Sequence, residues 1–218
     1  MKILKKVLPI VIFGVVGAVI IWRAPINGWS TVIWMTGNII MGVIRAPHEA
    51  ANKANVAVES RQNATENTLL FAIFLGNPVI PAAHLMFGVF DFAAYSLPLW
   101  ATGIGAAMLL LGLWMFRRSH ADLGRNWNVS LEIREEHTLV TDGVYKRIRH
   151  PMYTAIFLIF AAQPLLIHNW IAGWSALIAF TAIYVVRVSR EEAMMRDQFG
   201  EQYDRYCEAT GRLLPKIM

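Results

Sequence analysis

The sequence predicts an all-α protein, a polytopic integral membrane bundle of about five or six transmembrane helices. Hydrophobic residues make up 56% of the 218 residues, above the roughly 45–50% of soluble domains. Several apolar runs approach the roughly 20 residues that a helix needs to cross a bilayer. The polar residues are concentrated in short stretches between these runs and in the tail. Composition, run length and charge distribution therefore favour the same fold class.

Four apolar runs carry the prediction of spanning helices. The last is too long for one span, and the polar His168-Asn169-Trp170 offers a break, so two helices in a tight hairpin are expected there. A sixth segment, residues 30–44, is shorter and contains Gly37 and Asn38; we expect it to span with a kink, the alternative being an interfacial helix. The four runs are Val7 to Trp22, Thr68 to Phe90, Ala94 to Phe116 and Met152 to Val188.

Basic residues predict the orientation in the membrane. They cluster at the N-terminus, in residues 45–61, in residues 117–149 and after residue 187, while the expected outer loops are short and almost uncharged. Because basic loops stay on the cytoplasmic side, both termini are expected there. The first run is expected to be an anchor, since the Arg-Ala-Pro at 23–25 lacks a small-x-small cleavage pattern. The net charge of +5 indicates contact with anionic membrane lipids rather than nucleic acid.

The distribution of polar residues predicts one functional site. Residues 117–150 and 187–218 hold most of the charge, and both are expected on the same membrane face, joined by the helical hairpin. A single cysteine, Cys207, excludes an intramolecular disulfide framework. The six histidines show no metal-binding spacing, so no metal is expected. The oligomeric state is not indicated.

The stretch YKRIRHPMY, residues 145–153, places cations directly before an apolar helix. Residues 141–143, Thr-Asp-Gly, have the composition of a turn. Pro151 fits the first helical turn, which puts His150 at or near the N-cap. Helix N-termini favour anions because of their unpaired N–H groups and partial positive charge. Lys146 and Arg147 have a simpler interpretation as interfacial cations that reach lipid headgroups.

Four patterns in this order, with a hairpin between them, closely resemble the isoprenylcysteine carboxyl methyltransferase family, which belongs with the phospholipid methyltransferases. The resemblance covers about the last 85 residues; Ala155 stands where relatives often carry Gly. The patterns are Gly143-x-Tyr145, Arg149-His150-Pro151-x-Tyr153, the pair Glu191-Glu192, and Phe199-Gly200-x-x-Tyr203-x-x-Tyr206.

The resemblance implies S-adenosylmethionine as cofactor, held by the Arg-His-Pro loop and the helix of the glutamate pair, on the cytoplasmic face. His150 at the helix N-terminus suits the cofactor's carboxylate, Glu192 suits its ribose hydroxyls or ammonium, and the tyrosines suit the adenosine. The implied cofactor-binding residues are Gly143, Tyr145, His150, Pro151, Tyr153 and Glu192, and the implied catalytic residues are Arg149 and Glu191. Residues 117–218 form the expected catalytic region, and residues 1–116 the expected acceptor side.

The chemistry of the acceptor stays open at this stage. Methyl transfer is an in-line displacement that chiefly requires alignment. A carboxylate acceptor needs no base, and Arg149 would orient it by a bidentate contact. A phosphatidylethanolamine amine must first lose a proton, so Glu191 would act as general base. We favour a lipid-linked or otherwise hydrophobic carboxylate, which enters from the bilayer while the cofactor enters from the cytoplasm.

Other interpretations compete with this one. Membrane sterol reductases are similar in this region and bind NADPH, whose 2′-phosphate would suit Arg147 and Arg149. An inactive membrane scaffold is a further alternative. For the glutamate pair itself, the alternative is a solvated pair that forms ion pairs with Arg187, Arg190 and Arg196 at helical spacing. Tyr203 and Tyr206 are expected to dock the tail helix onto the membrane surface. The expected location is the inner membrane in a bacterium or the endoplasmic reticulum in a eukaryote.

Overall fold

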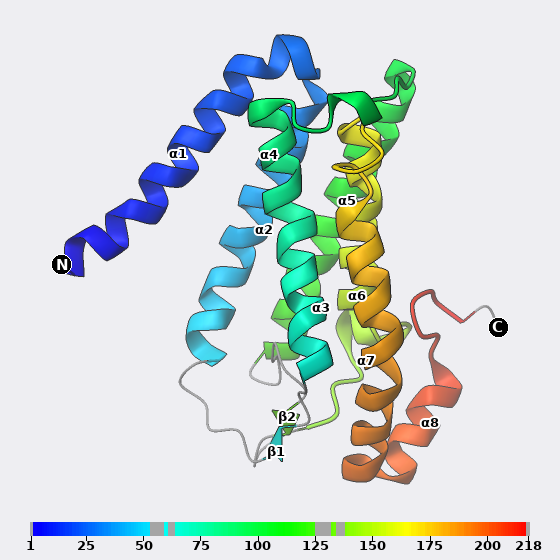
Figure 1. Ribbon diagram of the computed structural model, residues 1–218. Helices are drawn as coiled ribbons and strands as arrows, with labels where there is room; N and C mark the ends of the chain where they lie inside the picture. The colour runs from blue at the N-terminus through cyan, green and yellow to red at the C-terminus, as the bar shows by residue number, and fades with distance from the viewer. Residues whose placement is uncertain (1, 53–58, 61–63, 125–131, 134–137, 217–218) are drawn as a thin grey trace.

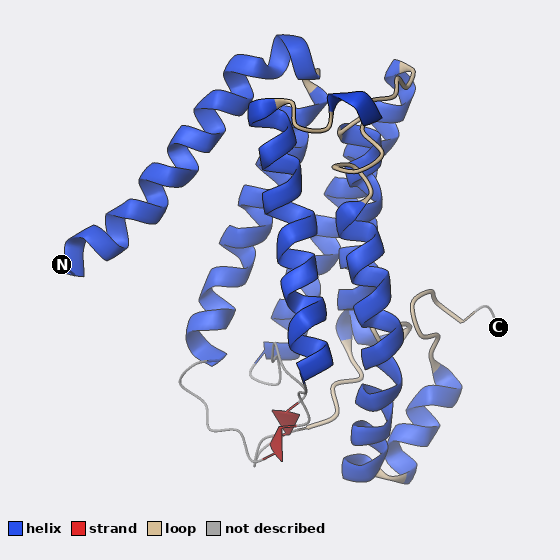
Figure 2. Ribbon diagram, viewed as in Figure 1, coloured by secondary structure: helices blue, strands red, loops and turns tan. Residues whose placement is uncertain are grey.

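The structure is a computed structural model that describes residues 2–52, 59–60, 64–124, 132–133 and 138–216. Nearly all of the described chain is helical (Figure 2). A two-residue antiparallel pair, β1 (Glu59–Ser60) with β2 (Glu132–Ile133), accompanies the helices. The helices are α1 (Lys2–Asn27), α2 (Ser30–Asn52), α3 (Ala64–Phe74), the π-helical segment η1 (Leu75–Val79), α4 (Ile80–Phe87), the 3₁₀ turn η2 (Asp91–Ala93), α5 (Leu99–Leu123), the 3₁₀ turn η4 (Gly143–Lys146), α6 (Pro151–Leu166), α7 (Ser175–Phe199) and α8 (Glu201–Ala209).

The helices α2 to α7 stand side by side as an upright bundle, while α1 diverges from it (Figure 1). The α5–α6 contact is the most extensive, α2 packs mainly on α5, and α3 packs mainly on α7. Close approach of α5 and α6 requires a glycine: a Cβ on Gly112 would lie 2.7 Å from Ile159 Cγ1. The short helix α8 folds back beside the end of α7 (Figure 1).

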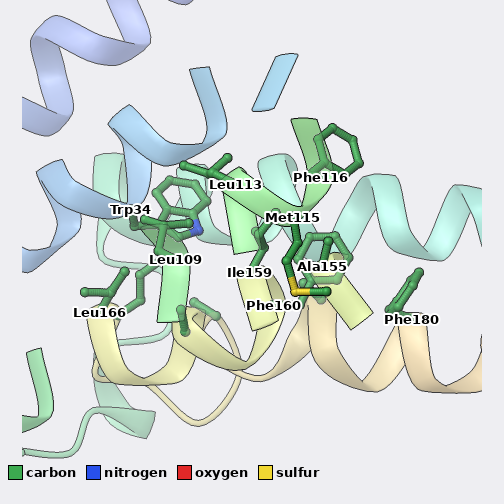
Figure 3. Packing of buried hydrophobic residues seen from close by; sticks show 14 of the residues in the cluster. Trp34, Leu109, Leu113, Met115, Phe116, Ala155, Ile159, Phe160, Leu166 and Phe180 are labelled. Atoms are coloured by element: carbon green, nitrogen blue, oxygen red, sulfur yellow. The ribbon is translucent and has the colours of Figure 1, made fainter. Parts of the chain in front are cut away.

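The apolar core lies where α2, α5, α6 and α7 meet. Figure 3 shows Phe116 of α5 and Ala155, Ile159 and Phe160 of α6 gathered in this region. Large apolar side chains also cover the outside of the bundle; Leu110, for example, is 68% exposed and Val185 is 65% exposed. A bundle that is apolar on both its inner and outer faces suits a hydrocarbon surrounding.

Within the described residues, two helical stretches are long and apolar enough to cross a membrane, Ala64–Phe87 and Leu99–Leu123. Two shorter apolar stretches are Gly14–Asn27 and Pro151–Leu166. The helical fold class is therefore confirmed, and the count of five or six spans stays a prediction. The segment at 30–44 lies in α2, which is a continuous helix through Gly37 and Asn38.

The boundaries of the expected helices shift where proline or a tertiary contact decides them. The run expected from Ala94 becomes helical only at Leu99, because Pro98 takes an extended conformation as N-cap. The run from Thr68 contains the π-helical segment η1 at Pro78, since proline lacks the N–H that a regular turn needs.

The hairpin expected in residues 152–188 is confirmed, with α6 ending at Leu166 and α7 beginning at Ser175. Asn169, which is fully buried, organises the connection. Its Nδ2 donates to the carbonyl of Phe90 (2.6 Å), and its Oδ1 accepts from the N–H groups of Ile171 (3.0 Å) and Ala172 (2.9 Å).

Candidate functional site

A cavity of about 600 Å³ opens between α2, α3, α5, α6 and α7, and most of the sequence-predicted site residues line it. Its wall includes Tyr145, Arg149, His150, Tyr153 and Glu191. Gly143, Pro151 and Glu192 are absent from the wall and stand directly behind it. The structure thus brings the loop and the glutamate pair together, as the sequence predicted, across more than 40 residues of chain.

Gly143 shapes the loop that carries Tyr145. Its φ of +60° lies in the region that favours glycine, and a Cβ there would collide with the Asp122 carboxylate. That carboxylate accepts a hydrogen bond from the Val144 N–H (2.9 Å). Tyr145 is 7% exposed. Burial, and then the negative charge of Glu191, raise the pKa of its hydroxyl. Asp122 belongs to α5, and no sequence pattern indicated its role.

His150 is the N-cap of α6 and Pro151 occupies its first turn, as predicted. The His150 side chain is buried and stacks on Tyr153 with ring centroids 5.4 Å apart. Its Nε2 lies 3.3 Å from Glu192 Oε1. His150 is therefore held in place by Glu192 of α7, and Tyr153 packs on the ring of His150.

Glu192 is the centre of a buried ionic network. Its side chain is 3% exposed. It accepts from Arg149 Nε (3.3 Å) and from Arg212 Nε (3.0 Å) and Nη2 (2.5 Å), besides contacting His150. Burial would raise the pKa of this carboxyl, but the hydrogen bonds from His150 and Arg212 outweigh burial and lower the pKa to about 2. The interpretation of Glu192 as solvated is wrong, because Arg149, His150 and Arg212 surround its carboxylate and exclude water from it.

Glu191 belongs to a second ionic cluster on the cavity wall. Tyr153 donates its hydroxyl to Glu191 Oε2 (2.6 Å), and Arg187 Nε lies 3.8 Å from the same oxygen. Arg187 Nη1 lies 3.3 Å from Oε1 of Glu66, a residue of α3 that is 1% exposed. Arg187 also lines the cavity. Its spacing to Glu191 was visible in the sequence, but the α3 partner was not, since nothing local links residues 66 and 187.

The tail pairs with the Arg-His-Pro loop along the backbone. The N–H of Arg149 donates to the Gly211 carbonyl (2.8 Å), and the N–H of His150 donates to the Arg212 carbonyl (3.0 Å). The Arg149 guanidinium donates to the carbonyls of Cys207 (3.1 Å) and Thr210. Arg149 is thus largely engaged by the tail, which the sequence did not indicate.

Tyr203 and Tyr206 of α8 are buried in the protein and line the cavity. Tyr206 donates its hydroxyl to the Tyr145 carbonyl (2.7 Å). The expectation that these side chains dock the tail on the membrane surface is wrong, because α8 packs against the loop and presents both rings to the site. The i, i+3 spacing of two tyrosines does not by itself distinguish contact with the membrane surface from burial at the site.

The cavity has an ionic end and an apolar end. Among its described lining residues, three arginines (Arg45, Arg149 and Arg187) accompany a single carboxylate, Glu191. The opposite end is apolar, lined by Met41, Leu70, Ile73, Phe116, Ile156, Phe160, Phe180 and Ile183. In the part of the chain that the structure describes, no group of three or more His, Cys, Asp or Glu side chains is arranged to hold a metal ion.

Comparison with known proteins identifies the class of fold. The structure of the eukaryotic intramembrane Ras methyltransferase ICMT is similar to this chain with a TM-score of 0.60 and 20% identity, covering 94% of this chain and 74% of that structure. The two chains therefore share a fold.

The sequence comparisons show similarity to one family over part of the chain. Residues 104–197 match the model of the isoprenylcysteine carboxyl methyltransferase (ICMT) family. Protein-S-isoprenylcysteine O-methyltransferase B of Arabidopsis thaliana is 28% identical over 120 residues, which are 54% of this chain and 61% of the plant protein. Protein-S-isoprenylcysteine O-methyltransferase of Homo sapiens is 31% identical over 120 residues, or 42% of its own length. The chain thus spans about two fifths to three fifths of these relatives, and its similarity to the ICMT family model lies in residues 104–197.

Proposed function

We propose that this protein is an S-adenosylmethionine-dependent membrane methyltransferase that methylates the carboxylate of a hydrophobic or lipid-linked acceptor. One observation carries the proposal: a single cavity joins a charged, tyrosine-rich end to an apolar end between helices. The relatives are named as O-methyltransferases of isoprenylcysteine, which combine these two chemistries. A small soluble acceptor has no need of a wall formed by apolar helices.

The residues at the ionic end fit the cofactor. The N-terminus of α6 with His150, and Arg149 beside it, suit the carboxylate of an amino acid. Glu191 suits an ammonium or sulfonium, and Tyr145 suits an adenosine, with Gly143 and Pro151 shaping the loop and Glu192 fixing His150 from behind. Bound S-adenosylmethionine would supply an activated methyl group.

Arg187 is the better candidate to orient an acceptor carboxylate. Arg149, proposed for this role on the sequence, donates to the tail carbonyls of Cys207 and Thr210 and to Glu192. Arg187 lines the cavity beside Glu191 and is anchored from behind by Glu66. A fixed guanidinium aligns a carboxylate without a base. Arg149 then acts as a positioning residue that holds loop, tail and Glu192 together.

The guanidinium groups on the wall support a carboxylate over an amine acceptor. Three arginines and one carboxylate line the cavity, and although Arg149 and Arg187 are paired with Glu192 and Glu66 behind the wall, a guanidinium can donate to a second carboxylate. A phospholipid N-methyltransferase remains the second candidate, supported by Glu191, which would act as general base. The Glu191→Gln variant separates the two: with carboxylate acceptors turnover persists, whereas an amine acceptor would lose at least about a hundredfold in rate.

Two further alternatives have less support. An NADPH-dependent reductase would need Arg147 and Arg149 for a 2′-phosphate, but Arg147 is exposed and does not line the cavity, and Arg149 is engaged by the tail. An inactive scaffold would not need a cavity in which loop, glutamate pair and tail tyrosines converge.

We further propose the membrane arrangement that the sequence predicts. Five or six spans would place both termini and the ionic end of the cavity in the cytoplasm, where the cofactor is available. Residues 1–116 would supply much of the acceptor side, since Met41, Leu70 and Ile73 line the apolar end. Residues 117–218 would supply the catalytic region. The membrane would be the inner membrane in a bacterium or the endoplasmic reticulum in a eukaryote.

A ligand titration of the purified protein in detergent tests the proposal. A ligand that binds only the folded state stabilises it by about 2.7 kcal/mol at a hundredfold excess over its dissociation constant. We expect S-adenosylhomocysteine to raise the unfolding temperature and NADPH to leave it unchanged. A shift with NADPH alone would favour the reductase. Lipid extracts incubated with S-adenosylmethionine carrying a radioactive methyl group would then reveal the acceptor.

A further inference from the structure

The apolar end of the cavity stops against a hydrogen-bonded layer in the middle of the bundle. We call this the polar layer. Gln163 is its centre, accepting from Trp34 Nε1 (3.1 Å) and donating to the carbonyls of Ala172 (2.8 Å) and Gly76 (3.2 Å). Ser175 Oγ also donates to the Gly76 carbonyl (2.6 Å). The polar layer comprises Trp34, Asn38, Gly76, Asn77, Gln163, Ala172 and Ser175.

The layer ties four helical elements together at one level. Asn77 Nδ2 donates to Asn38 Oδ1 (2.6 Å), which joins η1 to α2. Gly76 packs so tightly on α7 that a Cβ there would lie 2.7 Å from the Ser175 carbonyl oxygen. Gln163 is 1% exposed. Gln163 and Ser175 are hydrogen-bonded, whereas Asn77 Oδ1 is buried without a hydrogen-bond partner. Hydrogen-bonded polar groups in an apolar surrounding are costly to separate, so the layer is a barrier.

Asn77 of η1 belongs to the polar layer and also lines the cavity, whereas on α6 and α7 the cavity lining ends before the layer. On α6 it ends at Phe160 and on α7 at Phe180, whose rings meet edge to face with centroids 5.5 Å apart. One turn further, Gln163 of α6 belongs to the polar layer and no longer lines the cavity. Figure 3 shows Phe160 beneath the packed core and Phe180 on the neighbouring helix. The two rings therefore form the floor of the apolar end.

The helices give the depth of this floor. Tyr153 and Phe160 are seven residues apart on α6, as are Phe180 and Arg187 on α7, which is about 10 Å at 1.5 Å per residue. Along α3 and η1, Glu66 and Asn77 are eleven residues apart, or about 16 Å. An extended chain advances about 1.2 Å per bond, from about 3.6 Å per three-bond residue. The cavity therefore accommodates about 9 to 13 bonds beyond the ionic cluster.

We propose that the polar layer and the Phe160–Phe180 floor act as a length limit for the acceptor, selecting carboxylates on an apolar chain of up to about 13 bonds. This inference rests on the proposed function, because it assumes that the acceptor carboxylate lies at Arg187. Phe160 and Phe180 are then specificity-determining residues. Each methylene beyond the limit must displace a ring or the layer, and a methylene in a confined apolar pocket changes the specificity constant by about tenfold or more.

The test is methyl transfer to a series of N-acetyl-S-alkylcysteines with chains of 4 to 18 carbons, supplied in detergent micelles. We expect kcat/KM to rise with chain length and then to fall by about tenfold per methylene once the total length passes about 13 bonds. Phe160→Ala should move this fall to longer chains. Ile156→Trp, which fills the cavity one turn nearer the ionic end, should move it to shorter chains.

Phe157→Ala is the matched control, because Phe157 lies on α6 like Phe160 and contacts Phe180 and Tyr184 of α7 without lining the cavity. Its length profile should equal that of the unaltered protein. If Phe160→Ala does not fold, Asn77→Ala enlarges the same end and should shift the profile in the same direction. Equal turnover of all chain lengths beyond 13 bonds would overturn the limit, since the chain would then leave sideways between α2 and α3.

The two proposals fail in distinguishable ways. Uniform turnover across the series overturns the length limit but is consistent with the proposed methyltransferase function. Binding of S-adenosylhomocysteine without methyl transfer to any member overturns the carboxylate acceptor, and the length limit with it. A profile that moves equally in Phe160→Ala and Phe157→Ala would show general loosening of α6, which also contradicts a role for the floor.

Discussion

The Glu192 network makes a quantitative prediction about stability. A carboxyl pKa of about 2 in place of its ordinary value of 4.5 corresponds to about 3 kcal/mol of stabilisation at neutral pH, at about 1.4 kcal/mol per pH unit. Glu192→Gln removes the charge that Arg149, His150 and Arg212 share. We therefore expect the variant to lose about 3 kcal/mol of unfolding free energy at pH 7.

The sign of the pH dependence follows from the lowered pKa. The stabilisation is fully present above pH 4.5, the ordinary value, and is lost as the pH falls toward about 2. Urea unfolding in detergent between pH 7 and pH 2.5 should show this loss in the unaltered protein, and Glu192→Gln should lack that part of it. The matched control is Glu201→Gln, where an exposed carboxylate lies 3.7 Å from Arg205. If Glu192→Gln is no more destabilising than this control, the buried network does not stabilise the fold.

Three further predictions concern the loop, the tail and the acceptor end of the site. Gly143→Ala should lower the unfolding temperature by at least about 2–4 °C, because φ is +60° and the Cβ meets Asp122; an unchanged melting curve would contradict the strain. Tyr206→Phe loses its bond to the Tyr145 carbonyl, worth about 0.5–1.5 kcal/mol, so calorimetry should show up to about tenfold weaker S-adenosylhomocysteine binding. Arg187→Gln should raise the acceptor KM at least about tenfold in steady-state kinetics while the affinity for S-adenosylhomocysteine is unchanged; an equal loss of both would indicate a structural role.

Local rules explain which parts of the fold were predictable. The proline after His150 fixed the start of α6, and the polar residues at 168–170 indicated the turn of the hairpin, because both effects act within a few residues of chain. Helix boundaries at Leu99 and within η1 were missed or shifted, since they depend on Pro98, Pro78 and contacts with distant residues.

The contacts across helices account for what the sequence did not reveal. Asp122 and Arg212 contact the predicted loop and lie 21 and 62 residues from Gly143 and His150 in the numbering. Glu66 contacts Arg187, which was not predicted as a site residue, and lies 121 residues from it. Which side of a helix faces a partner depends on its rotation, and helices that are apolar all round carry little periodic signal for that rotation. The motif resemblance predicted the convergence of loop and glutamate pair, but its partners required the fold.

The Arg-His-Pro stretch performs three structural tasks at once. Pro151 begins α6, the backbone of Arg149 and His150 pairs with the tail, and both side chains reach Glu192 on α7. Replacing Arg149 by lysine would keep the charge but lose the planar fork that contacts Glu192 and two tail carbonyls together. The specificity of such a motif therefore reflects the number of elements that meet at it, and the cavity beside it exists because the tail, loop and glutamate helix are held in one network.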